Sequence, residues 1–273
     1  MEDILYRYNP WWEGRYTLEG IIERDEMLSL MKKYFSSRQV VFLTGLRRVG
    51  KTTLLRLFIK SLIDLEGIDV KHILYVSLDD YLLSRYTILE IVEKYRKIQK
   101  IRFRDKIILF LDEITYKKDF EIQLKNFYDS QNVKIYASSS SSSLMKGGKP
   151  YLTGRRTIIE ILPLDFGEFM HFRKIALSKA DSHLLESYFE EFMWTGGIPE
   201  FVLRGDVEYL KELVDDIIYK DIAAVYSIKN PDMLKDYFLL MMERAGKTAS
   251  INKIAHILKI SPDTAKRYFE MFA

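Results

Sequence analysis

The sequence predicts an α/β fold, with a parallel sheet in the first part of the chain and helices in the second. Short apolar, β-branched runs at 40–44, 107–111 and 133–137 are typical of strands that are buried on both faces. Segments with helical spacing of apolar residues separate these runs, and strands that alternate with helices form parallel sheets. From Phe166 onward helical periodicity dominates. We therefore expect a core built around a sheet, followed by helical segments.

Each element is predicted by its own pattern. The strand at 40–44 leads into a glycine-rich loop, and apolar residues of 54–65 then recur at helical spacing. The other expected strands are 72–78, 107–111, 133–137 and 157–161, with helices at 86–100 and 119–128 between them. Helical periodicity then covers 166–193, 206–224 and 231–245. We expect a core at 1–165, a helical lid at 166–225 and a helix-turn-helix or winged-helix unit at 226–273.

Composition excludes several classes of protein. The 273 residues are 48% hydrophobic and 30% charged, with a net charge of only +3, so the whole chain is not built for nucleic acid. Cysteine is absent, which excludes disulfides, thiolate catalysis and cysteine-ligated zinc. The four histidines are isolated in sequence, and no apolar run is long enough for a membrane span. Without a recognisable signal peptide at the start, we expect a soluble cytoplasmic protein with no membrane partner.

Residues 45–52, Gly-Leu-Arg-Arg-Val-Gly-Lys-Thr, match the phosphate-binding loop G-x-x-x-x-G-K-[ST]. Gly45 and Gly50 permit backbone angles that a Cβ would forbid, so that the loop N–H groups can face phosphate oxygens. Lys51 adds a charge that reaches the β- and γ-phosphates, and Thr52 offers a hydroxyl to Mg²⁺. The predicted nucleotide-binding residues of this loop are Gly45, Leu46, Arg47, Arg48, Val49, Gly50, Lys51, Thr52 and Thr53.

An acidic pair, Asp112-Glu113, directly follows the expected strand 107–111. Asp112 is predicted to hold Mg²⁺ together with Thr52, and Glu113 to activate the attacking water. A glutamate directly after the aspartate favours the hydrolysing class of P-loop proteins that has an additional strand in the sheet. No complete Asn-Lys-x-Asp guanine-recognition motif occurs, so ATP with Mg²⁺ is the expected ligand rather than GTP.

Weaker signals concern the catalytic surroundings. Six serines, 138–143, end the strand at 133–137, and Ser138 or Ser140 would suit a γ-phosphate sensor, although the run also suits a flexible low-complexity loop. Arg155 precedes the last expected strand and could stabilise transition-state charge, in cis or from a neighbouring subunit of a homo-oligomer. The alternative for this arginine is a solvated surface position. The expected catalytic set is therefore Glu113, Lys51, Ser138 and Arg155.

Some residues near these motifs have two interpretations. The phosphate-loop pattern leaves open whether Arg47 and Arg48 touch the nucleotide or a neighbouring subunit. Trp11 and Trp12 suit packing against the sheet edge better than stacking on adenine. The segment 147–149, Gly-Gly-Lys, resembles half of a phosphate loop and is interpreted as a turn.

The C-terminal segment predicts a helix-turn-helix. An amphipathic helix spans 250–258, and Ser261 and Pro262 are typical of the cap and first turn of a second helix. Phe269 and Phe272 are expected on the apolar face of that helix, with Lys266, Arg267 and other polar residues outward. Residues 247–273 have five basic and two acidic residues, so this tip is locally basic. It suits DNA contact or a protein-packing module, and a wing would be incomplete at Ala273.

Together these stretches resemble the prokaryotic, largely archaeal, AAA-superfamily ATPases with a C-terminal winged helix. The shared stretches are Asn9-Pro-Trp-Trp12, Ile22-Glu-Arg24, 45–53, 109–114, Gly154-Arg155, Leu162-Pro-Leu-Asp-Phe-Gly-Glu-Phe169, Gly196-Gly-Ile-Pro-Glu200 and Lys220-Asp221-Ile222. The resemblance implies a RecA-like P-loop NTPase core, a small lid and a winged helix, and it implies that Arg24 lies near the adenine. Where the family often has Thr-Gly-Ser, this chain has Ser138-Ser139-Ser140.

The predicted function is that of an Mg²⁺-dependent ATPase that couples hydrolysis to conformational change, with ATP and ADP as partners and DNA as a candidate partner. The alternative is a nucleotide-gated regulatory switch or DNA-binding regulator with little turnover, which the basic helix-turn-helix and the irregular serine run favour.

Overall fold

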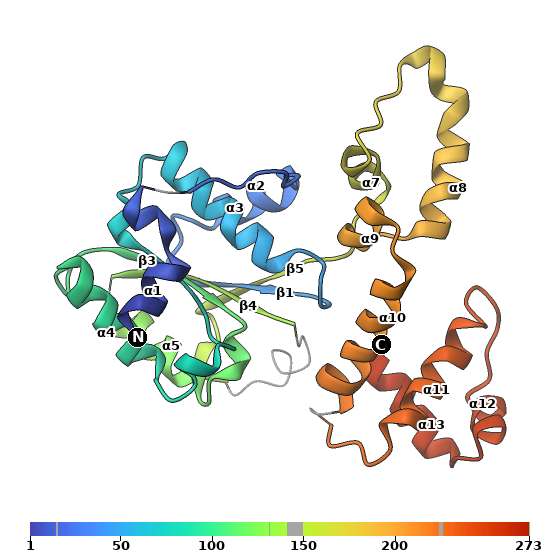
Figure 1. The fold of residues 1–273 in the computed structure, drawn as a ribbon. Helices are drawn as coiled ribbons and strands as arrows, with labels where there is room; N and C mark the ends of the chain where they lie inside the picture. Colours follow the sequence, from blue (N-terminus) through green and yellow to red (C-terminus); the bar gives the residue numbers. More distant parts are fainter. Residues whose placement is uncertain (15, 131, 141–149, 224–225, 273) are drawn as a thin grey trace. The chain divides into compact units, whose positions relative to one another are not determined.

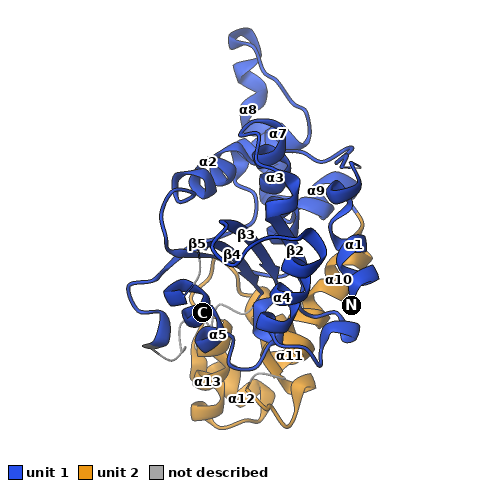
Figure 2. Ribbon diagram, turned by 90° about the vertical axis from the view of Figure 1, so that its left-hand side faces the viewer, with its two compact units in different colours: residues 1–205 blue, residues 206–273 orange. Residues whose placement is uncertain are grey.

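The computed structural model describes residues 1–14, 16–130, 132–140, 150–223 and 226–272. The chain forms two compact units, Met1–Gly205 and Asp206–Ala273, which we describe separately (Figure 2). The first unit contains the sheet and the first part of the expected lid segment. Within the described ranges, none of the helices has the length and apolar content needed to cross a membrane. Much of the serine run and the Gly-Gly-Lys segment, 141–149, lie outside the described residues.

A five-stranded parallel sheet lies at the centre of the first unit, as the sequence predicted (Figure 1). Its strands are β1 (Val40–Thr44), β2 (Ile73–Ser77), β3 (Ile107–Asp112), β4 (Val133–Ser139) and β5 (Arg156–Glu160). The spatial order is β2-β3-β4-β1-β5. Because β4 lies between β1 and β3, the sheet has the additional strand that the acidic pair had suggested.

Helices connect and follow these strands. In the first unit they are α1 (Glu2–Tyr8), α2 (Asp25–Lys33), α3 (Lys51–Asp64), α4 (Ile88–Gln99), α5 (Phe120–Ser130), α7 (Phe166–Phe172), α8 (Leu185–Thr195) and α9 (Pro199–Arg204). In the second they are α10 (Val207–Asp215), a π-helix (Asp216–Ala223), α11 (Pro231–Met242), α12 (Ile251–Leu258) and α13 (Pro262–Phe272). Short 3₁₀ turns lie at Pro10–Glu13, Val70–His72, Tyr81–Leu83, Ile114–Tyr116, Pro150–Leu152 and Lys179–Leu184.

Strands β1, β2 and β3 are almost wholly apolar because helices cover both faces of the sheet (Figure 1), whereas the edge strand β5 is only partly buried. Along β1, Val40 and Phe42 pack into one hydrophobic cluster, which also includes residues of α1, α4 and α5. Val41 and Leu43 face the other way, into a cluster that includes residues of α2 and α3. Side chains alternate across a strand, so a strand covered on both sides needs apolar residues at every position. All five residues of β1 are accordingly buried.

The segment Asn9-Pro-Trp-Trp12 closes the β2 edge of the sheet. The fully buried Asn9 amide pairs with the backbone of Tyr75, donating to its carbonyl (2.9 Å) and accepting from its N–H (2.7 Å). The indole N–H groups of Trp11 and Trp12 both point to the Ile73 carbonyl, at 3.4 and 3.0 Å. These contacts support the packing interpretation of the two tryptophans, because they satisfy polar backbone groups that an open edge strand leaves unpaired.

A small helical cluster follows β5 within the first unit. Leu164, Phe169, Phe172 and Val202 form its buried centre. The Leu164 N–H donates to the Gly197 carbonyl (2.7 Å), and a Cβ on Gly197 would lie 2.2 Å from the Leu164 carbonyl oxygen. This close backbone approach explains why a glycine stands at position 197.

The second unit has its own hydrophobic cluster, in which α12 and α13 form the expected helix pair. The Ser261 hydroxyl accepts from the Thr264 N–H (3.1 Å), so it caps α13 as predicted. One expectation was wrong: Phe269 is 42% exposed, and Ala265 and Tyr268 supply the buried face of α13. Phe272 packs partly against that cluster. Successive residues differ by about 100° around a helix, so the burial of Tyr268 turns Phe269 toward solvent.

Candidate nucleotide-binding site

The loop at 45–52 has the backbone that its glycines predicted. Gly45 has a φ of 139°, and a Cβ there would lie 2.2 Å from the Ile161 carbonyl oxygen. Gly50 has a φ of 98° and stands immediately before the first residue of α3. Arg48 also has a positive φ, 63°, which is uncommon for a residue other than glycine. The loop therefore turns sharply into the positive end of α3, the geometry that binds phosphate in P-loop proteins.

Lys51 is 5% exposed, and its ammonium donates to the carbonyls of Gly45 (2.9 Å) and Leu46 (2.8 Å). Its charge therefore lies against the loop itself, where phosphates would bind. Of the other predicted loop residues, Leu46 and Arg48 are exposed and Val49 is buried. Arg47, Thr52 and Thr53 are half-buried.

Asp112 is the centre of a hydroxyl network at the carboxyl ends of the strands. Its Oδ2 accepts from the Thr52 hydroxyl (2.7 Å) and the Tyr75 hydroxyl (2.8 Å), and its Oδ1 accepts from Ser138. Asp112 is only 2% exposed. The structure thus brings together Thr52, Asp112 and Ser138, which the sequence had proposed from three separate segments.

Tyr75, on β2, is a member of this network that the sequence analysis missed. Burial raises the pKa of its phenol above the ordinary value, and the charge of Asp112 raises it further. Tyr75 therefore keeps its proton and remains a hydrogen-bond donor. A tyrosine within a buried strand was the available signal, because a buried phenol needs a polar partner.

Glu113 lies at the end of β3 in a left-handed backbone conformation, with a φ of 49°. Its N–H donates to the Ser138 hydroxyl (3.0 Å), and its Oε2 accepts from the Ser140 hydroxyl (3.1 Å). Burial raises the pKa of the Glu113 carboxyl, Lys51 opposes that shift, and Asp112 adds to it. A raised pKa strengthens a carboxylate as a base, which suits the role predicted for Glu113.

Ser138 is fully buried between the two acidic residues, since its hydroxyl donates to Asp112 and accepts from the Glu113 N–H. Its contacts fix the acidic pair. Ser140 is half-buried and contacts the Glu113 carboxylate directly. Both serines thus contact the acidic pair: Ser138 bonds to the Asp112 carboxylate and the Glu113 N–H, and Ser140 bonds to the Glu113 carboxylate.

Arg24 connects the phosphate loop to the helical cluster after β5. Its guanidinium forms a two-pronged ion pair with Glu168 of α7, at 2.7 and 2.8 Å. It also donates to the carbonyls of Val49 (3.2 Å) and Leu162 (3.1 Å). Arg24 is only 6% exposed. The sequence had implicated Arg24 and had not identified Glu168 as its partner, although both stand in stretches shared with the resembled family.

A cavity of about 190 Å³ lies beside the phosphate loop, within the first unit. Its lining residues include Ile22, Arg24, Gly50, Thr53, Phe172 and Leu203. These residues come from the segment before α2, from the loop and α3, and from the helical cluster. Apolar walls next to a phosphate loop are suited to a nucleotide base, so this cavity is the candidate base site.

Arg155 is a predicted site residue that the structure does not place near the phosphate loop or the acidic pair. Its carbonyl accepts from the Val40 N–H (2.8 Å), at the start of β1, whereas the phosphate loop follows the end of that strand. A five-residue strand spans roughly 16 Å. The Arg155 side chain pairs instead with Asp129 (3.3 Å) at the surface.

The described residues contain no cluster of three or more histidine, aspartate or glutamate side chains that could hold a metal alone. The side-chain oxygen atoms that suit a metal at this site are those of Thr52 and Asp112, which share one hydrogen bond. Mg²⁺ commonly takes one or two protein oxygens and completes its coordination with water and substrate phosphates. The two residues therefore fit an Mg²⁺ ion that arrives with a nucleotide.

The strand order, the glycine-rich loop and the acidic pair define a P-loop nucleotide-binding fold of the class with an additional strand. Residues 37–170 match the family described as AAA domain. This segment, which contains all five strands and the site's loop and acidic pair, is therefore similar to AAA domains. Residues 186–273 match a family described as a domain of unknown function.

Curated relatives include two uncharacterized proteins of Methanocaldococcus jannaschii, 27% and 30% identical over 96% and 93% of this chain. An uncharacterized protein of Haemophilus influenzae is 25% identical over 88% of the chain. The chain spans 57–60% of the length of these relatives.

Similar solved structures include the Aeropyrum pernix ORC1 protein in complex with DNA, at 15% identity and a TM-score of 0.44. That similarity covers 92% of this chain and 83% of the other. AMPPCP-bound DnaA from Aquifex aeolicus has 18% identity and a TM-score of 0.42, covering 93% of this chain and 90% of the other.

Proposed function

We propose that this chain is an Mg²⁺-dependent ATPase that couples hydrolysis to movement of its helical segments. The observation that carries the proposal is the network around Asp112. This network joins a hydroxyl of the phosphate loop, Thr52, to the acidic residue at the end of β3. Glu113 follows directly, with a raised pKa and with Lys51 among the charges that act on it. A structural turn alone would not need a buried carboxylate facing the phosphate loop.

In this proposal the glycines of the loop leave room for the phosphates, and Lys51 and the N-terminus of α3 neutralise their charge. Thr52 and Asp112 would hold Mg²⁺, which supplies charge stabilisation to the phosphates. Glu113 accepts a proton from the attacking water, and the Ser140 hydroxyl orients its carboxylate. The cavity beside Thr53 and Ile22 would receive the adenine.

The Arg24–Glu168 pair is the proposed route from the nucleotide to the helical segments. Arg24 holds the carbonyl of Val49 in the phosphate loop and the carboxylate of Glu168 in α7 at the same time. A change of loop conformation at Val49 therefore alters the geometry of a buried ion pair on α7. Movement of the lid with the state of the nucleotide follows from this connection.

Replacing Glu113 by glutamine tests the assignment of the base. E113Q should retain ATP binding and lose turnover by about 100-fold or more, since it removes only proton acceptance. K51A should weaken binding as well, because it removes the charge at the phosphates. Nucleotide affinity and steady-state phosphate release measure the two effects. E93Q, at an exposed position of α4, is the matched control. Wild-type turnover in E113Q would contradict the assignment.

The alternative function is a nucleotide-gated, DNA-binding regulator with little turnover. The exposed side chains of Lys266 and Arg267 on α13 favour it, because a helix that follows a tight turn can enter a major groove. In this hypothesis the two cations contact DNA phosphates, and nucleotide exchange rather than hydrolysis sets the state of the protein.

Phosphate release with and without duplex DNA separates the two functions. Release that is faster than nucleotide exchange supports a motor or remodelling ATPase, and slower release supports the switch. DNA binding itself is tested with K266Q/R267Q, which should lower the salt dependence of affinity by about 0.9 of a log unit for each lost contact. Unchanged binding in this variant would assign α13 to protein packing instead.

A further inference from the structure

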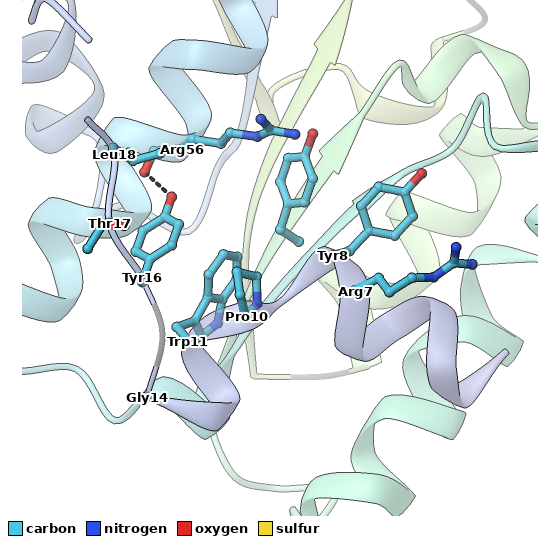
Figure 3. Close-up of a pocket in the computed structure, with 10 residues that line it drawn as sticks. Arg7, Tyr8, Pro10, Trp11, Gly14, Tyr16, Thr17, Leu18 and Arg56 are labelled. Atoms are coloured by element: carbon cyan, nitrogen blue, oxygen red, sulfur yellow. Dashed lines mark hydrogen bonds between the residues drawn. The ribbon is translucent and has the colours of Figure 1, made fainter. Parts of the chain in front are cut away.

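A second cavity, of about 750 Å³, lies between the N-terminal segment, α3 and the edge strand β2 (Figure 3). The side chains that matter most in its lining are Arg7, Tyr8, Trp11, Tyr16, Arg56 and Tyr75. None of its described lining residues also lines the small cavity beside the phosphate loop. It is therefore a separate site from the one proposed for the adenine.

Among the described residues, the charged side chains that line this second cavity are arginines, while the carboxylate of Asp80 accepts a hydrogen bond from the lining residue Tyr8 (2.9 Å). Two arginines, Arg7 from α1 and Arg56 from α3, contribute to its wall, and both are exposed to solvent. No carboxylate is among the described residues that line it. Such a site attracts an anion, and guanidinium groups are well suited to phosphate because they can donate two parallel hydrogen bonds.

The rest of the wall is rich in aromatic rings. Trp11 and Tyr16 meet edge to face, with centroids 4.8 Å apart, and the rings of Tyr8 and Tyr75 are 5.9 Å apart. The Tyr16 hydroxyl is fixed by a hydrogen bond to the backbone carbonyl of Arg56 (2.7 Å), which Figure 3 shows. Trp11 and Tyr75 are 3% and 2% exposed, so they support the wall from behind, and the half-buried rings of Tyr8 and Tyr16 are the ones open to a planar ligand.

Tyr75 links this cavity to the acidic pair. Its ring lies in the cavity wall, with the Arg56 guanidinium 5.5 Å from the ring centroid. Its hydroxyl donates to Asp112 Oδ2 (2.8 Å), the same oxygen that accepts from Thr52. A ligand that moves Arg56 or Tyr75 therefore acts on the residue proposed to hold Mg²⁺.

We propose that this cavity binds a nucleotide unit, either free or within single-stranded nucleic acid, and that Tyr75 transmits its presence to Asp112. The exposed guanidinium groups of Arg7 and Arg56 would recognise phosphate, and the half-buried rings of Tyr8 and Tyr16 would contact the base. An acidic peptide would use the arginines alone and leave the aromatic wall without a function. Regulation through Tyr75 rests on the proposed ATPase function, whereas binding in the cavity does not.

The binding test uses the full chain, with thymidine 5′-monophosphate and a fluorescent oligothymidylate as probes. R7Q/R56Q should bind the probes about tenfold more weakly, and the salt slope for the oligonucleotide should fall by about 0.7 for each lost phosphate contact. R102Q/R104Q, which changes two exposed arginines of the segment before β3, is the matched control. The two probes distinguish a free nucleotide from a strand.

Four results would overturn the binding proposal. The first three are equal weakening in R102Q/R104Q, absence of binding to either probe at low salt, and stronger binding of an oligoglutamate peptide that is equally sensitive to R7Q/R56Q. The third would assign the cavity to an acidic peptide. Oligothymidylate binding in K51A should equal that of the wild type, because the phosphate loop takes no part; a matching loss in K51A, the fourth result, would place the probe in the loop.

The coupling test measures phosphate release with and without oligothymidylate. In the wild type the probe should change the rate by about twofold or more, and this response should be lost in R7Q/R56Q. Y75F keeps the ring and removes only the hydroxyl that reaches Asp112, so the ratio of its rates with and without the probe should be close to one, whatever its basal rate. A full response in Y75F would overturn the role of Tyr75. A chain without any turnover would refute the proposed ATPase function and leave the binding result to decide the cavity.

Discussion

At the scale of single residues, the candidate site depends on how one buried carboxylate is satisfied. Asp112 accepts hydrogen bonds from Thr52, Tyr75 and Ser138, which come from α3, β2 and β4. Burying a carboxylate is costly unless its oxygens receive hydrogen bonds. These donors keep Asp112 in one position, so that the same oxygens are available to a metal that arrives with a nucleotide.

The prediction at this scale concerns the effect of Glu113 on stability. Burial raises its pKa in the folded protein, so the folded state binds more protons than the unfolded state between the unfolded and folded pKa values. The stability that this group contributes is complete below the unfolded pKa and is lost as pH rises through the folded pKa. E113Q should therefore raise the melting temperature at pH 7 relative to the wild type, and the difference should shrink on acidification.

Thermal unfolding of E113Q and the wild type between pH 4 and pH 8 checks this expectation, with E93Q as the exposed control. Acidification should increase the stability that Glu113 contributes but decrease the activity of the wild type. Turnover requires the ionised carboxylate, so it should fall on acidification with a midpoint above the ordinary glutamate value of 4.5. An E113Q melting temperature below that of the wild type at pH 7 would show that the Glu113 charge stabilises the fold.

At the scale of elements, local pattern predicted most of the sheet. All five strands lie where the sequence had placed them, and the central ones are apolar because both of their faces are covered. Contacts between distant segments were less predictable. The pairing of Asn9 with Tyr75 and the hydrogen bond from Tyr75 to Asp112 depend on strand order, which no local pattern states. Phe269 was misplaced because a one-residue shift rotates a helix face by about 100°.

The prediction at the scale of elements concerns the Arg24–Glu168 ion pair. E168Q removes the negative charge that pairs with Arg24, which is 6% exposed, so we expect a loss of about 1.5–3 kcal/mol in stability, the range of a hydrogen bond to a charged group. Nucleotide affinity should fall too, because Arg24 also holds the Val49 carbonyl of the loop. Denaturant unfolding and nucleotide titration measure both.

E191Q is the matched control for this pair, because Glu191 and Arg173 form an exposed ion pair in the same helical segment. Exposed pairs contribute less than about 1 kcal/mol, so E191Q should differ little from the wild type. Equal effects of E168Q and E191Q would mean that the Arg24 pair is an ordinary surface contact and does not connect the loop to α7.

At the scale of the whole molecule, the candidate chemistry lies in one compact unit and the basic helix in the other. The phosphate loop, the acidic pair and Arg24 all belong to Met1–Gly205, and α13 belongs to Asp206–Ala273. Each unit has its own hydrophobic cluster. The sequence located both features by local motifs, but the three-part division at 165 and 225 was drawn from periodicity alone and stays a prediction.

The prediction at the scale of the whole molecule concerns Arg155. It lies by the start of β1, whereas the phosphate loop follows the end of that strand, so it does not reach the loop of its own chain. If Arg155 stabilises transition-state charge, it does so in a neighbouring copy of the chain. R155A should then lose turnover while keeping nucleotide affinity, because its own phosphate loop is intact.

Mixing two inactive variants tests this arrangement. R155A supplies an intact Glu113, and E113Q supplies an intact Arg155, so mixed oligomers contain sites with both groups. The phosphate release of the mixture should clearly exceed the sum of the separate rates. R155A mixed with the double variant E113Q/R155A is the control, since no Arg155 is then present and no recovery should occur. If R155A alone turns over at the wild-type rate, the arginine is a surface residue that pairs with Asp129.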